Sequence, residues 1–145
     1  MAAESQTFAL AAREDRLVER PGVPLARGAA RLLQGLGYAP LTEFSLATGR
    51  RVDVFGVARD GGLIAVEVKS SRQDFLSDAK WPDYLAFCDL FYFAVPEGFP
   101  DALLPPEHGM MRVDAYGGAI LRPAAPAPAV WPGPAPGTGK VRGTR

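Results

Sequence analysis

The chain has 145 residues, of which 48% are hydrophobic and 22% charged, and its formal net charge is zero. This length suits one domain with a core and is short for two, and the composition is that of a globular protein. No apolar run approaches the roughly 20 residues that cross a bilayer, so we expect no membrane association.

Charge and cysteine content restrict the expected partners and the expected cellular location. Residues 123–145 carry three basic side chains and no acid, so residues 1–122 hold 13 basic and 16 acidic side chains. The chain lacks the overall basic charge that favours nucleic acids, so any contact with DNA has to be local. Cys88 is the only cysteine and the N-terminus lacks a signal-peptide pattern, so we expect a cytoplasmic protein without an internal disulfide.

An arm followed by a helix is predicted at the N-terminus. Residues 1–24 are mixed polar and alanine-rich, and they end in Pro21-Gly22-Val23-Pro24, which interrupts any helix that they begin. From Leu25 to Leu36, apolar residues recur at intervals of three and four, and nearby glycines mark the end of the pattern. We therefore predict a peripheral arm over residues 1–24 and an amphipathic helix over residues 25–36.

The hydrophobic period then changes to that of β-strands. Residues 41–46 alternate loosely, residues 51–57 are rich in β-branched side chains, and residues 63–69 form a nearly continuous apolar run. Gly49 separates the first two segments, and Asp60-Gly61-Gly62 is a hairpin-type turn between the second and third. Three strands joined by short turns predict an antiparallel meander.

The second half of the chain is expected to return to the same sheet. Ser71-Arg72-Gln73-Asp74 has the spacing of a capping box, with Asp in place of Glu or Gln, and predicts a short helix through Lys80. Pro82 ends that helix or lies in the first turn of the next one. An aromatic strand over residues 90–95 and a last hairpin over residues 109–122 follow.

The C-terminal segment differs in composition. Residues 123–145 hold six prolines and four glycines, mostly in Ala-Pro repeats. Such a segment cannot bury enough apolar surface to offset the entropy lost on ordering, so we predict a disordered tail. Trp131 is its one aromatic residue and is either a docking point for a partner or a chance aromatic in a linker.

Three charged residues are predicted to meet at one end of the central hairpin. Side chains two residues apart on a strand share a face, so Glu67 and Lys69 project together while Val66 and Val68 face the core. Asp53 lies near the start of the preceding strand, and antiparallel pairing places the start of that strand beside the end of the next. Asp53, Glu67 and Lys69 therefore converge where the third strand ends.

These residue types suit metal-dependent phosphodiester hydrolysis. Two carboxylates with an open side favour a hard divalent cation such as Mg²⁺ (or Mn²⁺), which binds oxygen ligands and keeps several waters. A neighbouring lysine stabilises negative charge that develops on a phosphate, or helps to orient or deprotonate a water on the metal. The alternative is a surface Glu–Lys pair and a solvated aspartate, which are common on any sheet.

Motif order and two sequence stretches resemble a known family. The order helix, strand, Asp-bearing strand, hairpin, Glu-x-Lys strand, helix and strand resembles the PD-(D/E)XK, or restriction-endonuclease-like, superfamily. More narrowly, GRRVDV at residues 49–54, VEVKSSRQDFLSDAKW at residues 66–81 and residues 84–89 are similar to the MmcB-like bacterial DNA repair proteins. The resemblance covers roughly residues 25–122, and the run from Glu67 to Trp81 is its specific part.

The resemblance implies an α/β fold, with an α-β-β-β-α-β core and a mixed central sheet flanked by helices, formed by residues 25–122. It implies that Asp53 and Glu67 bind the metal ion and that Lys69 is the catalytic lysine. Glu43 is a candidate additional acid, although it lies on the first strand here rather than on the first helix. Val52 stands where the superfamily often has a proline before the aspartate.

Polar and basic residues near this site form the candidate DNA-binding set: Arg50, Arg51, Ser71, Arg72, Lys80 and Trp81. Lys80 and Arg72 would hold phosphates while Trp81 stacks on a base, and the alternative is that the charged members are only solvated. Asp74 and Asp78 oppose the basic character of this surface. His108 has no partners at zinc spacing and is not expected to be catalytic, and Cys88 is expected in the core.

We therefore hypothesise a single-domain, Mg²⁺-dependent deoxyribonuclease of DNA repair that uses metal-activated water, with DNA and other repair proteins as partners. The alternative is a non-catalytic DNA-binding or scaffold protein of a repair complex that retains the nuclease fold. Action on RNA or on a nucleotide is a third option, because nothing in the sequence reads a base sequence or a 2′-hydroxyl.

Overall fold

Six strands form one mixed sheet at the centre of the structure, a computed structural model that describes residues 20–125. The spatial order follows the chain order: β1 (Ala39–Ser45), β2 (Arg51–Val57), β3 (Leu63–Val68), β4 (Leu90–Val95), β5 (Gly109–Val113) and β6 (Gly118–Arg122). β1, β2 and β3 pair antiparallel, β3, β4 and β5 pair parallel, and β6 pairs antiparallel with β5. The predicted antiparallel meander, mixed sheet and final hairpin are confirmed.

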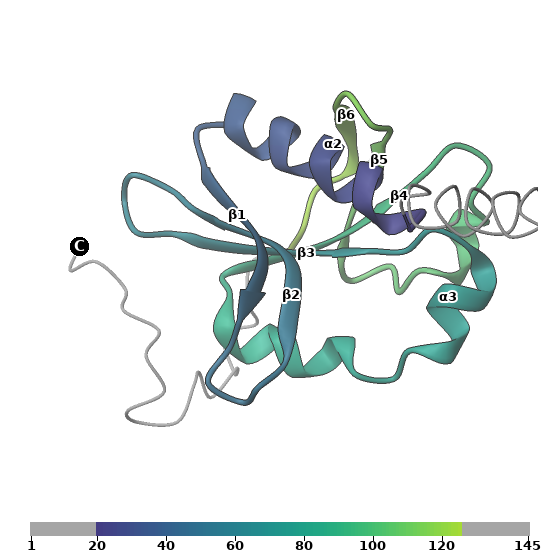
Figure 1. Cartoon of the computed structure of the whole chain (residues 1–145), viewed down its shortest axis with the longest axis horizontal. Coiled ribbons are helices and arrows are strands. Elements are labelled where there is room, and N and C mark those ends of the chain that lie inside the picture. The colour runs from purple at the N-terminus through teal and green to yellow at the C-terminus, as the bar shows by residue number, and fades with distance from the viewer. Residues whose placement is uncertain (1–19, 126–145) are drawn as a thin grey trace, which may run out of the picture.

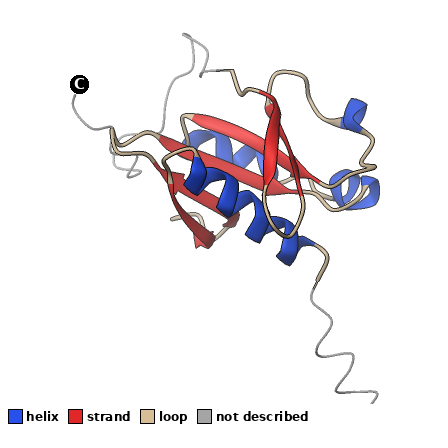
Figure 2. Ribbon diagram, turned by 90° about the horizontal axis from the view of Figure 1, so that it is seen from above, coloured by secondary structure: helices blue, strands red, loops and turns tan. Residues whose placement is uncertain are grey.

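Helices cover both faces of this sheet (Figure 1). α2 (Gly22–Gly35) lies on one face, and α3 (Arg72–Ser77) with the 3₁₀ helix η1 (Trp81–Phe87) forms the connection from β3 to β4 on the other side. Parallel strands require such a crossover, because a tight turn reverses the chain direction. Figure 2, turned so that α2 lies nearer the viewer, shows the sheet between helical layers. The predicted α/β fold with an α-β-β-β-α-β core is confirmed.

The two faces of the sheet bury different kinds of side chain. Under α2 the core is mainly aliphatic and includes Leu33 and Val66, both fully buried. Under η1 it is strongly aromatic and includes Phe91 and Phe93. Each such side chain contributes about 1.5–3 kcal/mol when it leaves water. These two layers of packing hold the central strands, and with them the end of β3, in place.

α2 begins three residues earlier than the sequence pattern predicted. Pro21 is its N-cap, and Gly22, Val23 and Pro24 form the first turn. Amide groups in the first turn have no intrahelical acceptor, so a proline there removes no helical hydrogen bond. The Pro-Gly-Val-Pro segment therefore begins the helix instead of interrupting it. Further along α2, a side chain at Gly28 would meet the carbonyl oxygen of Asp114 at 1.7 Å, so a glycine is required for this close approach.

The segment after β3 is helical as predicted, in two short pieces. The Ser71 side chain accepts a hydrogen bond from the Asp74 amide at 3.1 Å and caps α3, as the capping-box spacing indicated. α3 ends at Ser77 and not at Lys80, because Asp78 is extended at φ −106° and ψ 113°. The following helix is the 3₁₀ helix η1, with Pro82 in its first turn.

Two of the expected segments, the N-terminal arm and the C-terminal tail, lie largely outside residues 20–125. Residues 1–19 of the predicted arm and residues 126–145 of the predicted tail, with Trp131, lie outside the described part of the chain, so both remain predictions. Of the helices within the described range, none has the length and apolar character needed to cross a membrane.

Candidate active site

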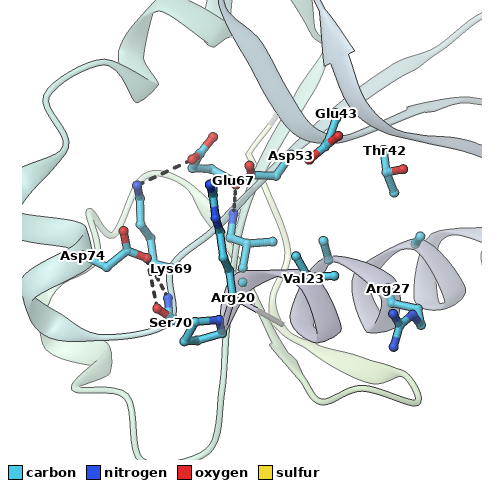
Figure 3. Close-up of a pocket in the computed structure, with 15 residues that line it drawn as sticks. Arg20, Val23, Arg27, Thr42, Glu43, Asp53, Glu67, Lys69, Ser70 and Asp74 are labelled. Atoms are coloured by element: carbon cyan, nitrogen blue, oxygen red, sulfur yellow. Dashed lines mark hydrogen bonds and ion pairs between the residues drawn. The ribbon is translucent and has the colours of Figure 1, made fainter. Parts of the chain in front are cut away.

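Asp53, Glu67 and Lys69 come together at the open end of the β2–β3 hairpin (Figure 3). Val54 of β2 pairs with Val66 of β3, so Asp53 and Glu67 lie one step further toward that end, opposite one another. Lys69 follows the last residue of β3, and its backbone amide donates to the Ala94 carbonyl of β4 at 3.0 Å. Glu67 therefore lies on β3, Lys69 is held at the end of β3 by its hydrogen bond to β4, and β2 supplies the second carboxylate, that of Asp53.

The two carboxylates occupy a buried setting that does not suit two negative charges. Asp53 Oδ2 accepts a hydrogen bond from the Val68 amide at 2.8 Å, whereas Glu67 is only 6% exposed and its Oε2 accepts no hydrogen bond from a donor among the described residues. A hydrogen bond also links the carboxyl groups of Asp53 and Glu67. Burial, and then the nearby Asp53 carboxyl, raise the pKa of Glu67 to about 9. Burial also raises the pKa of Asp53, although the Val68 hydrogen bond opposes this. Without a cation, this pair retains a proton at neutral pH.

Lys69 is held as a charged ammonium beside these carboxylates. Its Nζ lies 2.5 Å from Asp78 Oδ2 and 3.5 Å from Glu67 Oε1, and the residue is 3% exposed. Burial lowers the pKa of Lys69, but the hydrogen bond to Asp78 and the charges of Glu67 and Asp78 outweigh burial, so this pKa is raised. A lysine in this state stabilises negative charge well and is a poor base. Of the roles considered for Lys69, charge stabilisation fits the geometry best.

Asp74 and Asp78 support the site from the loop that follows β3. Asp74 Oδ2 accepts hydrogen bonds from the Ser70 amide at 2.9 Å and the Ser70 hydroxyl at 3.3 Å. Asp78 Oδ1 accepts from the Lys80 amide at 2.7 Å, which leaves Oδ2 for Lys69. Burial raises the pKa of Asp78, but the Lys69 hydrogen bond outweighs it and the pKa is lowered. The sequence predicted Asp74 in a capping box and both aspartates as charges opposing the basic surface, but not their contacts with Ser70 and Lys69.

A pocket of about 780 Å³ opens over the carboxylates. It lies between the N-terminal half of α2, strand β1 and the ends of β2 and β3 (Figure 3). Its lining residues are Arg20, Pro21, Gly22, Val23, Ala26, Arg27, Ala30, Thr42, Glu43, Asp53, Glu67, Val68, Lys69, Ser70 and Asp74. Sequence reasoning did not include the α2 residues of this set, because they lie far from the Asp…Glu-x-Lys motif along the chain.

Glu43 lies at the rim of this pocket beside Asp53 (Figure 3). The register pairs Thr42 with Val54 and Phe44 with Val52, which places Glu43 opposite Asp53. Its backbone has φ of 51°, a left-handed conformation that disfavours a residue with a Cβ atom. The structure thus brings the predicted additional acid to the pocket, on an exposed and conformationally strained residue of β1.

The residues present fit a hard divalent cation with two carboxylate ligands. Within residues 20–125, no group of three or more His, Cys, Asp or Glu side chains is arranged to hold a metal ion. Mg²⁺, however, is commonly bound through one or two carboxylates, with waters and substrate phosphates completing its shell. The unpartnered Glu67 Oε2 beside Asp53, facing an open pocket, matches that donor set.

The candidate DNA-binding residues lie around the site and not within it. Among the described residues, the pocket lining includes none of Arg50, Arg51, Ser71, Arg72, Lys80 and Trp81. Arg50 Nε forms an ion pair with Asp83 Oδ2 at 2.6 Å, and the Arg51 carbonyl accepts from the Tyr84 hydroxyl at 2.8 Å. Arg72 and Lys80 are exposed, on α3 and just before η1. A phosphate role for these two remains a prediction.

Trp81 belongs to the aromatic core and does not present its face to the pocket. Its ring lies 5.0 Å from that of Phe93, 5.7 Å from that of Phe91 and 5.2 Å from that of His108. These rings cover part of Trp81, which is half-buried, and its stacking on a base stays a prediction. Burial lowers the pKa of His108, consistent with a packed, neutral imidazole. Cys88 is buried, as predicted.

The fold and these residues define a class of protein. A mixed sheet flanked by helices, with Asp on the second strand and Glu-x-Lys at the end of the third, is the arrangement of the PD-(D/E)XK, restriction-endonuclease-like superfamily. The sequence model of the family described as "DNA repair protein MmcB-like" matches residues 10–130. The chain therefore belongs to the MmcB-like family of DNA repair proteins.

A solved structure supports the fold. The chain is similar to a protein from Silicibacter pomeroyi described as "SPO1766 protein of unknown function", with 46% sequence identity and a TM-score of 0.73. The similarity covers 77% of each chain. No curated protein sequence matches the chain. Family membership thus indicates a role in DNA repair. The reaction itself has to be inferred from the residues of the site.

Proposed function

We propose that this protein is a divalent-metal-dependent nuclease that acts on DNA during repair. Asp53 and Glu67 would hold Mg²⁺ or Mn²⁺, and Lys69 would stabilise negative charge on the phosphate under attack. The observation that supports this most directly is the buried Oε2 of Glu67, which accepts no hydrogen bond from a donor among the described residues and lies beside a second carboxylate. A cytoplasmic location and an association with other repair proteins are further parts of the proposal.

The chain's own groups divide the work of phosphodiester hydrolysis. The Val68 amide orients the Asp53 carboxyl group, which is also hydrogen-bonded to that of Glu67. Asp78 holds the Lys69 ammonium against Glu67, where it can balance charge on a phosphate oxygen. When bound, a divalent ion supplies Lewis acidity and lowers the pKa of an attacking water. The pocket above these groups leaves room for the substrate.

The competing function is a non-catalytic DNA-binding or scaffold role in a repair complex. The charge balance of the described residues favours it, because residues 20–125 carry 12 acidic and 11 basic side chains. Such a surface gives little general attraction for DNA, so productive binding would depend on the metal, on a local basic surface or on a partner.

A cleavage assay separates the two functions. The purified protein is incubated with Mg²⁺ or Mn²⁺ and with single-stranded, duplex, nicked and branched DNA, alongside an RNA strand of the same sequence. Asp53→Ala and Lys69→Ala are tested in parallel, with Arg59→Gln as a control at the remote end of the β2–β3 hairpin. Metal-dependent cleavage that is lost in both site variants and kept in the control supports the nuclease. Folded protein that cleaves none of these substrates supports the scaffold.

A further inference from the structure

The pocket has two chemically different sides. Its floor carries the carboxylates of Asp53 and Glu67, whereas its wall is formed by α2 and the residue that precedes Pro21. Residues 20–35 contain three arginines and no acidic residue, although the described chain as a whole has more acids than bases. Two of these arginines, Arg20 and Arg27, line the pocket. Positive charge is thus concentrated on the one helix that faces the carboxylates.

Arg20 points across the pocket toward Glu67, and Arg27 lies further along α2 (Figure 3). The first turn of α2 contains no acidic side chain, and the helix has no side-chain cap at its N-terminus. The positive end of the helix dipole therefore adds to the charge of Arg20. Glu67 is 94% buried and its Oε2 accepts no hydrogen bond from a donor in the described structure, which indicates that this pocket receives a ligand.

The spacing along α2 indicates the class of ligand. Arg20 lies two residues before Gly22, the first residue of α2, and the helical stretch from Gly22 to Arg27 rises about 7.5 Å. Phosphates of one DNA strand advance by about 3.4 Å per nucleotide along a duplex, so this stretch alone spans about two nucleotides. A phosphodiester chain laid along α2 contacts both and brings one phosphate to the carboxylates.

We propose that Arg20 and Arg27 bind two phosphates of one DNA strand that runs along α2, with the Arg20 phosphate next to Asp53 and Glu67. This proposal rests on the proposed function, because it assigns the strand-binding wall of the same site. It differs from the surface predicted by sequence, where Arg50 is paired with Asp83 and Trp81 is packed in the core. α2 thus replaces the η1 side as the principal DNA contact.

The test measures equilibrium binding, not cleavage. Fluorescence anisotropy follows the binding of labelled single-stranded and duplex DNA to the full chain, with Ca²⁺ in place of Mg²⁺ to limit cleavage, over a range of salt concentrations. The variants are Arg20→Gln, Arg27→Gln and both together. Arg59→Gln, in the turn between β2 and β3, removes the same charge at the far end of the hairpin.

Each pocket variant is expected to weaken binding about 5–10-fold and to reduce the salt slope by about 0.9 for duplex or 0.7 for single strands. The double variant should lose about twice that slope, and Arg59→Gln should stay within about twofold of wild type. Equal behaviour of Arg20→Gln, Arg27→Gln and Arg59→Gln would overturn the proposal. So would the absence of DNA binding by the wild type.

Two further outcomes separate this proposal from the proposed nuclease. Binding that depends on Arg20 and Arg27 in a protein that never cleaves DNA overturns the nuclease and leaves the binding wall intact. Normal cleavage by the double variant would overturn the proposed strand binding by Arg20 and Arg27 and would leave the proposed nuclease function standing. A third outcome is that only Arg20→Gln weakens binding and that a mononucleotide competes as well as DNA does. This would show a site for a single phosphate and would overturn the proposal that a DNA strand contacts both arginines.

Discussion

The acidic side chains at the two ends of β3 differ in their hydrogen bonding. At its beginning, the Leu63 amide donates to Asp89 Oδ2 at 2.8 Å, and the Asp89 amide returns a hydrogen bond to the Leu63 carbonyl at 2.8 Å. At its end, the Val68 amide engages one oxygen of Asp53, while Glu67 Oε2 has no partner in the described part of the chain. Both ends are built from carboxylates and backbone amides, but only the second leaves a buried oxygen unpaired.

This difference distinguishes a structural carboxylate from a candidate ligand. Asp89 ties the crossover to the start of β3 through two backbone hydrogen bonds, which suffices to explain its position. Glu67 gains no such bond at Oε2 and makes the fold less stable at neutral pH, because burial disfavours its charge. A residue with an unfavourable effect on stability at the end of a strand fits a role in binding or catalysis.

The largest expected effect comes from replacing one acidic residue at each end of β3 and comparing the two variants. Asp53→Asn should reduce cleavage by roughly 100–1,000-fold, since it removes a ligand that acts on the transition state. Asp89→Ala should leave the specific activity of folded protein near that of wild type and lower the free energy of unfolding by about 1–3 kcal/mol, because the Leu63 amide loses its acceptor. Initial rates and urea unfolding measure the two quantities. Equal losses of activity in both variants would contradict the distinction.

Asp78 is expected to have the next largest effect, as a positioning residue for Lys69. Asp78→Asn should lower cleavage by about 10–100-fold, because the Lys69 ammonium is no longer held and loses part of its charge stabilisation. The Asp78 hydrogen bond raises the pKa of Lys69, so its loss lowers that pKa and the activity should decline at a lower pH on the alkaline side.

The matched control for Asp78 is Asp83→Asn, which removes an exposed partner of Arg50 on the same connection. Its pH–rate profile should overlay that of the wild type. Asp78→Glu should restore part of the activity, since it keeps the charge. An unshifted alkaline limb in Asp78→Asn would show that Asp78 serves the fold alone.

Glu67 should make the stability of the metal-free protein depend on pH. Its pKa is about 9 in the fold against an ordinary value of 4.5, so the folded state binds the proton more tightly than the unfolded state. Below about pH 4 both states are protonated and no difference arises; between about pH 5 and 9 the free energy of unfolding falls as pH rises.

Glu67→Gln should remove most of this dependence. At pH 8 in EDTA it should raise the free energy of unfolding by up to about 5 kcal/mol, and at pH 4 it should match the wild type. Denaturant unfolding at both values of pH measures the difference. A constant offset between the two proteins across this range would rule out the burial of an uncompensated carboxyl.

The smallest effect is expected at Glu43, on the rim. Its φ of 51° favours glycine, so Glu43→Gly should raise the free energy of unfolding by about 0.5–1 kcal/mol, and Glu43→Ala should not. Thermal unfolding of the two variants gives the comparison. If neither variant is stabilised, the left-handed conformation at this position has no measurable cost.

Local patterns predicted most of the sheet and the centre of the site. The alternation of β3 placed Glu67 and Lys69 on one face, and the Asp60-Gly61-Gly62 turn set the pairing that brings Asp53 opposite Glu67. The start of α2 was predicted too late, because the proline pair looks like a helix breaker when its position in the first turn is unknown. The packing of Trp81 on the aromatic core was not predicted, because an aromatic residue after a basic one fits a binding surface as well as a core.

The sequence by itself thus determined the strands, the hairpin register and the Asp53–Glu67–Lys69 centre, because side-chain period and turn type act over a few residues. Only the tertiary structure decided that α2 lies over the open end of the hairpin, so that Arg20 and Arg27 line the same pocket as the carboxylates. It also decided that Asp78 holds Lys69 and that Trp81 packs on Phe93. These contacts depend on how separate elements pack in space, and packing is not encoded in the period of any one element.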